Sequence, residues 1–170
     1  MGGDVGIMFT LQEIYDLAIQ IEKNGEAFFR EAEKKISKPT LKSLFLWLAE
    51  QEVKHSSWFK QKKESSKVKS ETLALDKMTV KMLKDILGDQ SFSLREVEIN
   101  RVKTVEDLLS VAIEFEEDTI IFFQMVRSLV DDDTVKGLDE IIEEETHHIK
   151  MLRDFRDEGE QDLITIKGKT

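Results

Sequence analysis

An internal repeat constrains the fold of this 170-residue chain more than any other feature of its sequence. Thr10, Ala18, Glu22 and Phe28-Phe29 correspond to Thr104, Ala112, Glu116 and Phe122-Phe123, all at one offset of 94 residues (104 − 10). In both copies the apolar residues recur every three to four positions, which is the spacing of one helix face. Two helix pairs joined by a crossover are the natural structural meaning of such a repeat.

Three of the four predicted helices carry a recognisable start signal. Thr10 and Glu13 have the spacing of a capping box, which predicts that the first helix begins there. Thr104 and Asp107 repeat this spacing at the start of the third helix. Pro39 is well placed in the first turn of the second helix, because a first-turn residue needs no backbone N–H donor.

Composition and connection length favour a bundle of long helices. The chain has only 1 Pro and 8 Gly, and 40% of its residues are hydrophobic. About 40 residues separate the second and third helices, too many for a tight turn, and they include a short predicted helix ending at Gly88. We therefore predict an all-α four-helix bundle with a long crossover between the second and third helices. The predicted organisation is a flexible lead (1–9), a bundle (10–156) made of helix pairs 10–62 and 104–156 with crossover 63–103, and a C-terminal tail (157–170).

Charge and composition exclude several classes of protein. A net charge of -10 argues against binding to nucleic acid, because phosphates are repelled by an acidic surface. The absence of Cys excludes disulfide bonds, zinc-finger sites and thiol catalysis. No apolar run approaches the roughly 18 residues that span a bilayer, and the N-terminus lacks the pattern of a secretory signal. A cytoplasmic protein without a membrane partner is therefore expected.

All three histidines follow a glutamate by three positions, as Glu52/His55, Glu144/His147 and Glu145/His148. Positions three apart lie on one face of a helix, so the carboxylate and the imidazole of each pair can reach a common point. Oxygen and nitrogen ligands together suit iron, manganese or zinc. The alternative for each pair taken alone is a surface pair on a charged helix.

The helical register selects between the two C-terminal pairs. Glu145 and His148 extend the apolar stripe of the fourth helix, whereas Glu144 and His147 point further round. The repeat favours the same pair, because Glu52 falls on Glu145 at an offset of 93 residues (145 − 52). The difference of one residue from the first offset needs only a single deletion in the loop between two helices.

The other two helices each contribute one glutamate. Glu22 lies one turn after Ala18 within an apolar stripe, and Glu116 has the same place in the second half. Taken alone, each would be a solvated helix charge, since a buried carboxylate is costly unless it is paired or bound to metal. Two divalent ions would offset four carboxylates, so the full set is more plausible than any one member. The predicted metal ligands are Glu22, Glu52, His55, Glu116, Glu145 and His148.

The remaining candidates receive simpler roles. Four glutamates are predicted to face solvent: Glu114, Glu117, Glu143 and Glu144. His147 is predicted to be exposed or to support a ligand from outside the site. Trp47 and Trp58 are predicted to pack in the core or in a dimer contact.

Two stretches of the sequence resemble the rubrerythrin family of ferritin-like diiron-carboxylate proteins. They are Ala18-x-x-x-Glu22 followed by Phe28-Phe29, and residues 48–55 (LAEQEVKH). The resemblance covers roughly residues 10–62 and 104–156, and it implies a ferritin-like four-helix bundle. It also implies that the six predicted ligands hold two iron ions, with Glu52 and Glu145 as the bridges between them.

The resemblance implies a function, and the chain departs from the family pattern at four points. Full-length rubrerythrins carry a four-cysteine iron module that delivers electrons, so this chain would need an external donor such as a rubredoxin-type protein. Thr119 stands where peroxidases of the family tend to have glutamate, and Phe29 and Phe123 stand where tyrosine is usual.

The expected function is that of a homodimeric oxidoreductase in which a reduced iron pair gives two electrons to peroxide or dioxygen. The alternatives are oxidation and handling of ferrous ion, and a non-enzymatic bundle whose site holds zinc or no metal.

Overall fold

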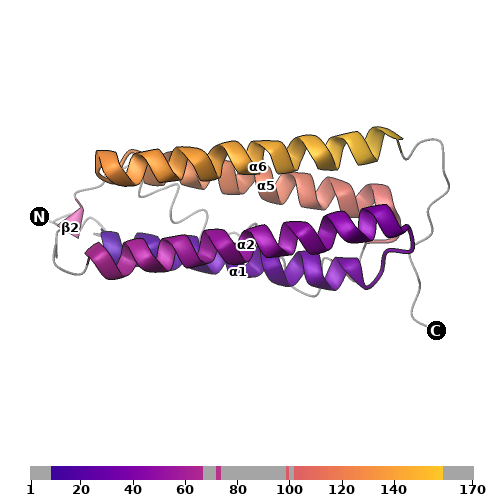
Figure 1. Ribbon diagram of the computed structural model, residues 1–170, viewed down its shortest axis with the longest axis horizontal. Helices are drawn as coiled ribbons and strands as arrows, with labels where there is room; N and C mark the ends of the chain where they lie inside the picture. The colour runs from indigo at the N-terminus through magenta and orange to yellow at the C-terminus, as the bar shows by residue number, and fades with distance from the viewer. Residues whose placement is uncertain (1–8, 67–71, 74–98, 100–101, 159–170) are drawn as a thin grey trace, which may run out of the picture.

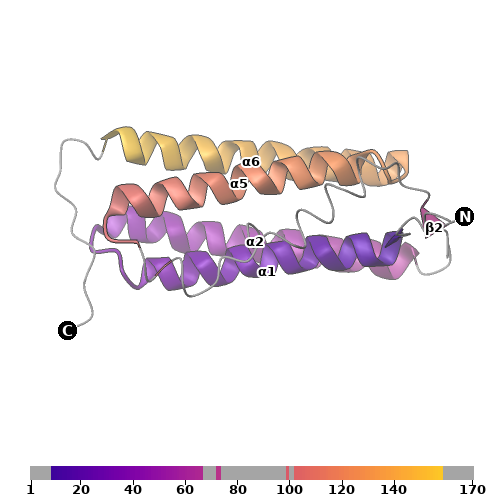
Figure 2. The same cartoon turned by 180° about the vertical axis from the view of Figure 1, so that it is seen from behind.

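A computed structural model of the chain describes residues 9–66, 72–73, 99 and 102–158. Its elements, in order, are β1 (Phe9–Thr10), α1 (Leu11–Glu33), α2 (Pro39–Ser66), β2 (Thr72–Leu73), α5 (Val105–Arg127) and α6 (Asp132–Glu158). The four long helices lie side by side as two pairs, α1 with α2 and α5 with α6 (Figures 1 and 2). None of the described helices is long and apolar enough to cross a membrane.

The second helix ends and the third begins at opposite ends of the bundle. α2 ends beside β2 at one end, whereas α5 begins at the other (Figure 1). Most of the predicted crossover (63–103), including its predicted helix ending at Gly88, lies outside the described residues, as do residues 1–8 and 159–170.

A short antiparallel ladder connects the start of the bundle to the chain beyond α2. Phe9 of β1 pairs with Leu73 of β2, and Thr10 pairs with Thr72. Because Thr10 also caps α1, this ladder fixes the entry of the chain into its first helix.

The helices begin where the capping signals predict. Thr10 accepts a hydrogen bond from the backbone N–H of Glu13 (3.2 Å), and the Glu13 carboxylate accepts one from the backbone N–H of Thr10 (2.7 Å). Thr104 and Asp107 form the same reciprocal pair at the start of α5. Pro39 is the first residue of α2. Each capping side chain satisfies a backbone donor that has no partner within its helix.

The apolar core forms two clusters, one toward each end of the bundle. Large members of the first cluster are Phe28, Phe29, Phe45, Leu48 and Leu108. Large members of the second are Tyr15, Phe59, Phe122, Phe123 and Leu138. Each such side chain stabilises the fold by roughly 1.5–3 kcal/mol relative to exposure. Along α1, α2 and α6 the predicted ligands fall between the two clusters, and on α5 Glu116 directly follows Phe115 of the second cluster. A polar layer therefore crosses the middle of the bundle.

The two tryptophans differ in burial, and only one of them packs against the core. Trp58 is partly buried and packs against the second cluster, where its ring occupies the space beside Gly137. Trp47 is 38% exposed, so it is not a core residue of this chain. Its ring instead lies edge-on to His148, with the ring centroids 5.2 Å apart.

Candidate metal centre

The polar layer collects side chains from all four helices. α1 contributes Glu22, α2 contributes Glu52 and His55, α5 contributes Glu116, and α6 contributes Glu145 and His148. All six residues are between 0 and 3% exposed. The structure therefore brings together every residue that the sequence predicts as a metal ligand.

Within this layer the six residues form two overlapping groups. The first group is Glu22, Glu52, His55 and Glu145, and the second is Glu52, Glu116, Glu145 and His148. In each group one ligand atom per residue lies within 4.8 Å of the others. Glu52 and Glu145 belong to both groups. Two groups that share two carboxylates are the arrangement expected of two neighbouring metal ions joined by bridging carboxylates.

The buried oxygens of the site fit a metal pair. Both carboxylate oxygens of Glu22, Glu52 and Glu116 are buried and have no hydrogen-bond partner among the described residues. A buried carboxylate without partners is strongly destabilising, because it has lost its hydration. Oxygen and imidazole-nitrogen donors match iron, manganese and zinc, and two divalent cations would offset the charge of four carboxylates. The residues present therefore fit such a pair.

Both histidines direct the same nitrogen toward the carboxylates. The Nδ1 atom of His55 lies 2.9 Å from Glu145 and 3.5 Å from Glu22. The Nδ1 atom of His148 lies 2.7 Å from Glu145 and 3.4 Å from Glu116. The His148–Glu145 contact is a hydrogen bond, whereas Nδ1 of His55 is within ion-pair distance but lacks hydrogen-bond geometry. Nδ1 is thus the atom that each imidazole offers to the centre.

Burial sets the protonation of three carboxyl groups. It raises the pKa of Glu52 and of Glu116 well above the ordinary value, and the neighbouring carboxylates raise both further. Burial also raises the pKa of Glu22, although contact with His55 opposes this shift. Protons held at these positions have to leave before cations bind, so metal binding is coupled to proton release.

Glu145 behaves in the opposite way because it lies between the two histidines. Burial alone would raise its pKa, but His148 and His55 hold the pKa of Glu145 below its usual range. Burial likewise opposes charge on the imidazoles, yet Glu145 and Glu22 raise the pKa of His55 to about 12. Glu116 and Glu145 raise the pKa of His148 to about 9. Without bound cations, the two imidazolium groups stabilise the ionised Glu145.

The outer nitrogens of the two histidines have different surroundings. Nε2 of His55 lies 2.7 Å from a carboxylate oxygen of Glu144, whose side chain is 57% exposed. Nε2 of His148 is buried and has no hydrogen-bond partner among the described residues. The prediction that Glu144 faces solvent is therefore incomplete, because its exposed carboxylate also contacts a residue of the site.

The other candidates remain outside the centre. His147, Glu114 and Glu143 are exposed, and Glu117 pairs with Arg153 on α6. One residue of the centre was not predicted from the sequence, namely Gly25 of α1.

Gly25 lets a carboxylate approach the backbone of α1. A Cβ atom at this position would lie 2.5 Å from Oε2 of Glu52 and 2.8 Å from the ring of Phe115. Only glycine leaves room for the carboxylate there. At the offset of 94 residues (119 − 25), Gly25 corresponds to Thr119, which is buried and donates its hydroxyl to the carbonyl oxygen of Phe115 at 2.9 Å.

Comparisons with known proteins agree with this geometry. The family model described as Rubrerythrin matches residues 13–156. A solved structure from Thermotoga maritima, titled as a ferritin-like diiron-carboxylate protein, is 26% identical in sequence with a TM-score of 0.72. The match covers 89% of this chain and 97% of that one, and it confirms the predicted all-α, ferritin-like bundle. No curated protein matches the chain.

Proposed function

The chain belongs to the rubrerythrin family, and we propose that it is a dinuclear-iron oxidoreductase that reduces peroxide or dioxygen with electrons from an external donor. The observation that most strongly supports a pair of metal ions is that the two ligand groups share Glu52 and Glu145. A single ion needs only one such group, whereas two adjacent ions need shared carboxylates to offset their mutual repulsion.

The proposal assigns each ligand a place. Glu22 and His55 would hold one ion, Glu116 and His148 would hold the other, and Glu52 and Glu145 would bridge them. When bound, a pair of ferrous ions supplies two electrons to one peroxide molecule, which with two protons becomes two molecules of water. Carboxylates suit this chemistry because they can shift between bridging and terminal positions as the charge of the ions changes.

The surrounding side chains exclude water from the centre. Phe29 and Phe123 are fully buried in the two apolar clusters on either side of the polar layer. Water is thereby kept from the centre along the bundle axis, which limits side reactions. The protons that reduction consumes have to come from groups other than the six ligands, because carboxyl groups that bind metal have released their own protons.

The proposed source of electrons is another molecule. The chain has no Cys, so it cannot build the four-cysteine iron module that serves as the donor in full-length rubrerythrins. A rubredoxin-type protein is the proposed donor. A homodimer is the proposed assembly.

A second candidate function is oxidation of ferrous ion for iron handling. Thr119 favours it, because its hydroxyl donates a hydrogen bond to the carbonyl oxygen of Phe115 and this residue supplies no fifth carboxylate near the centre. In this case ferrous ion is the substrate, and dioxygen or peroxide is the oxidant. A storage role would require a closed shell of many subunits, so light scattering that reports a dimer would argue against storage.

The test combines metal analysis with rapid kinetics. We expect about two irons per chain after anaerobic loading, and oxidation of the ferrous protein by peroxide much faster than that of free ferrous ion. Glu52→Gln and Glu145→Gln should each lower the iron content and abolish the rapid phase. Glu114→Gln, an exposed substitution on α5, is the matched control and should leave both unchanged.

Three results would separate the candidates. Peroxide oxidation no faster than that of free ferrous ion would contradict the oxidoreductase proposal. Rapid oxidation by dioxygen with continued turnover of added ferrous ion would favour iron handling. Tight zinc retention without any redox reaction would identify a non-enzymatic bundle.

A further inference from the structure

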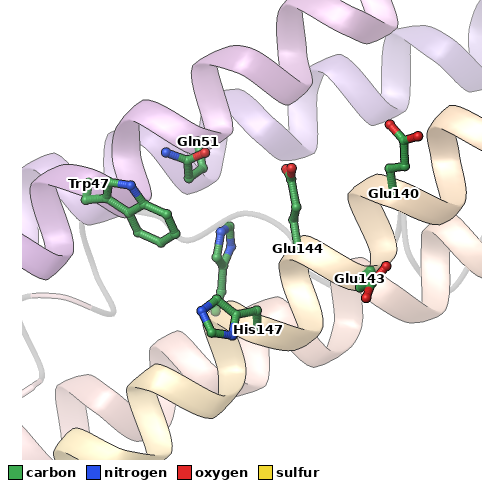
Figure 3. Close-up of a pocket in the computed structure, with 7 residues that line it drawn as sticks. Trp47, Gln51, Glu140, Glu143, Glu144 and His147 are labelled. Carbon is green, nitrogen blue, oxygen red and sulfur yellow. The ribbon is translucent and has the colours of Figure 1, made fainter.

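A pocket of about 550 Å³ lies beside the centre, between α2 and α6 (Figure 3). Its lining residues are Trp47, Gln51, Glu140, Glu143, Glu144, His147 and His148. The first two come from α2 and the other five from α6. Glu140, Glu143 and His147 are exposed, so the mouth of the pocket is in contact with solvent.

The mouth of the pocket offers ligands for a divalent cation. Figure 3 shows the carboxylates of Glu140 and Glu144 extending from α6 toward α2, with His147 one helical turn further along. The lining contains three carboxylates and two imidazoles but no lysine or arginine. Carboxylate oxygens and imidazole nitrogens are the donors that divalent transition metals prefer, and a pocket of one charge sign raises the local concentration of cations.

The pocket contains one histidine of the centre, and a second lining residue contacts the other histidine. His148 lines the pocket, is 1% exposed, and has an Nε2 atom without a hydrogen-bond partner among the described residues. The Nδ1 atom on the other side of the same ring lies 2.7 Å from Glu145 in the centre. Glu144 also lines the pocket, and it contacts Nε2 of His55. A buried imidazole nitrogen without a partner is a donor available to a ligand in the pocket.

Two other directions into the centre, along the bundle axis and on the side of α1, are closed among the described residues. Along the bundle axis, the two clusters that contain Phe29 and Phe123 lie on either side of the polar layer. On the side of α1, the notch at Gly25 is filled by the carboxylate of Glu52 and the ring of Phe115. A hydrated cation moving through either apolar cluster would lose its water without gaining ligands, which is very costly. The α2–α6 pocket is a polar approach to the centre among the described residues.

We propose that the α2–α6 pocket is a loading site, in which Glu140, Glu143 and His147 capture a divalent cation that then enters the centre past Glu144 and His148. This inference rests on the proposed function, because it requires the centre to bind metal. It goes beyond that function by assigning cation capture to residues that are not ligands of the bound pair. Capture sets the rate of loading, whereas the six buried ligands set the final amount.

The test measures the rate and the amount separately, with Co²⁺ as the probe. Metal-free protein is mixed with Co²⁺, its visible absorption is followed in time, and the bound cobalt is then measured by elemental analysis. The pocket variant is Glu140→Gln/Glu143→Gln, and the control variant is Glu106→Gln/Glu114→Gln. Both remove two exposed negative charges, so they lower the overall attraction for cations equally.

The pocket variant should load about tenfold more slowly than the wild type, because local attraction of a cation changes association rates by roughly 10–1000-fold. The control should change the rate less than about twofold, and all three proteins should reach the same cobalt content. Adding His147→Gln should slow the pocket variant further.

The possible failures are distinguishable. Wild-type protein that binds no Co²⁺ would contradict the proposed function itself. Full cobalt binding with equal rates in the pocket and control variants would leave that function standing and overturn the loading site. Equal slowing of both variants would show that overall charge controls loading, which also overturns it.

A second measurement isolates the pocket from the centre. In Glu52→Gln/Glu145→Gln the bridging carboxylates are lost, and we expect one weaker Co²⁺ site to remain in the pocket. Glu140→Gln/Glu143→Gln introduced into that variant should remove the remaining site, whereas Glu106→Gln/Glu114→Gln should not. Circular dichroism establishes that each variant is folded. Absence of any remaining site would contradict capture in the pocket.

Discussion

The two halves of the centre have matching ligands but different surroundings. In the first half, His55 is held on its outer side by Glu144, and Gly25 leaves room for a bridging carboxylate. In the second half, His148 has no hydrogen-bond partner on its outer nitrogen, and Thr119 takes the place of Gly25. The repeat has therefore kept the ligands while the neighbouring residues diverged. The first half has a carboxylate partner behind its histidine, whereas the histidine of the second half itself lines the pocket.

The first prediction uses pH to separate the two histidines in metal-free protein. The pKa of His148 is raised to about 9 and that of His55 to about 12, both above the ordinary value. An NMR titration should therefore show His148 losing its proton first. Because the raised values belong to the folded state, the stabilisation from His148 is fully present below about pH 6.5 and is lost as the pH rises through 9.

The same shifts predict how the stability of the metal-free protein changes with pH. Each proton held only by the folded state lowers the free energy of unfolding by about 1.4 kcal/mol per pH unit as the pH rises. The raised carboxyl pKa values of Glu52 and Glu116 act in the same direction, beginning at lower pH. Urea denaturation at pH 6 and pH 9 measures the difference. Metal-saturated protein is the control, and a metal-free protein more stable at pH 9 would contradict the assignment.

The second prediction concerns Gly25, whose lack of a side chain leaves room for the carboxylate of Glu52 in the first half of the centre. Gly25→Ala should lower the affinity for metal by about 100-fold, because the new Cβ displaces the bridging carboxylate of Glu52 from a position that tolerates little error. The displaced atoms are side-chain ends, so the helix should still form, and alanine favours helix over glycine by about 1 kcal/mol. Isothermal titration with Co²⁺ measures the effect. Thr119→Ala, at the corresponding position, is the control, and equal losses in both variants would refute the asymmetry.

The third prediction removes the outer support of His55. Glu144→Gln should weaken binding of one ion by about tenfold and leave the other nearly unchanged, since partners behind a metal-ligating histidine typically contribute 10–100-fold to affinity. The measurement is the same titration, fitted to two sites. Glu143→Gln changes the neighbouring exposed carboxylate and should leave both equilibrium affinities as they are. A uniform loss at both sites would indicate general electrostatics rather than support of His55.

The fourth prediction tests whether His148 can be given a carboxylate partner like the one that His55 has. Gln51 occupies the position in α2 that corresponds to Glu144 in α6, and both line the pocket. Gln51→Glu should therefore offer His148 a carboxylate partner and strengthen binding of the second ion by about threefold, a smaller gain because its geometry is not already optimised. Combining it with Glu144→Gln should reverse the order of the two affinities. Weaker binding of the second ion in Gln51→Glu would argue against this correspondence.

The metal ligands were predictable from the sequence because two independent patterns, the helical spacing and the internal repeat, both indicate them. The i, i+3 spacing of Glu52 with His55 places both on one helix face, and the repeat locates Glu145 and His148 on the matching face. Helix starts were also predictable, because capping is a local interaction between residues three apart. The end of α2 was not: it continues to Ser66, where the side chain of Gln12 on α1 bonds to the last turn.

The contacts that could not be predicted from the sequence depend on distances between helices. The contact between Glu144 and His55 joins residues 89 apart in the chain and requires the actual spacing of α2 and α6. The role of Gly25 likewise depends on how closely the carboxylate of Glu52 approaches α1. Neither contact produces a periodic pattern in the sequence, so only the three-dimensional structure reveals it.

The most direct measurement is a crystal structure of metal-loaded protein with anomalous scattering recorded at the iron edge. It should show two peaks in the polar layer, the first ligated by Glu22 and His55 and the second by Glu116 and His148. The carboxylates of Glu52 and Glu145 should lie between them. A single peak, or peaks only at exposed carboxylates outside the bundle, would contradict a paired metal centre in this protein.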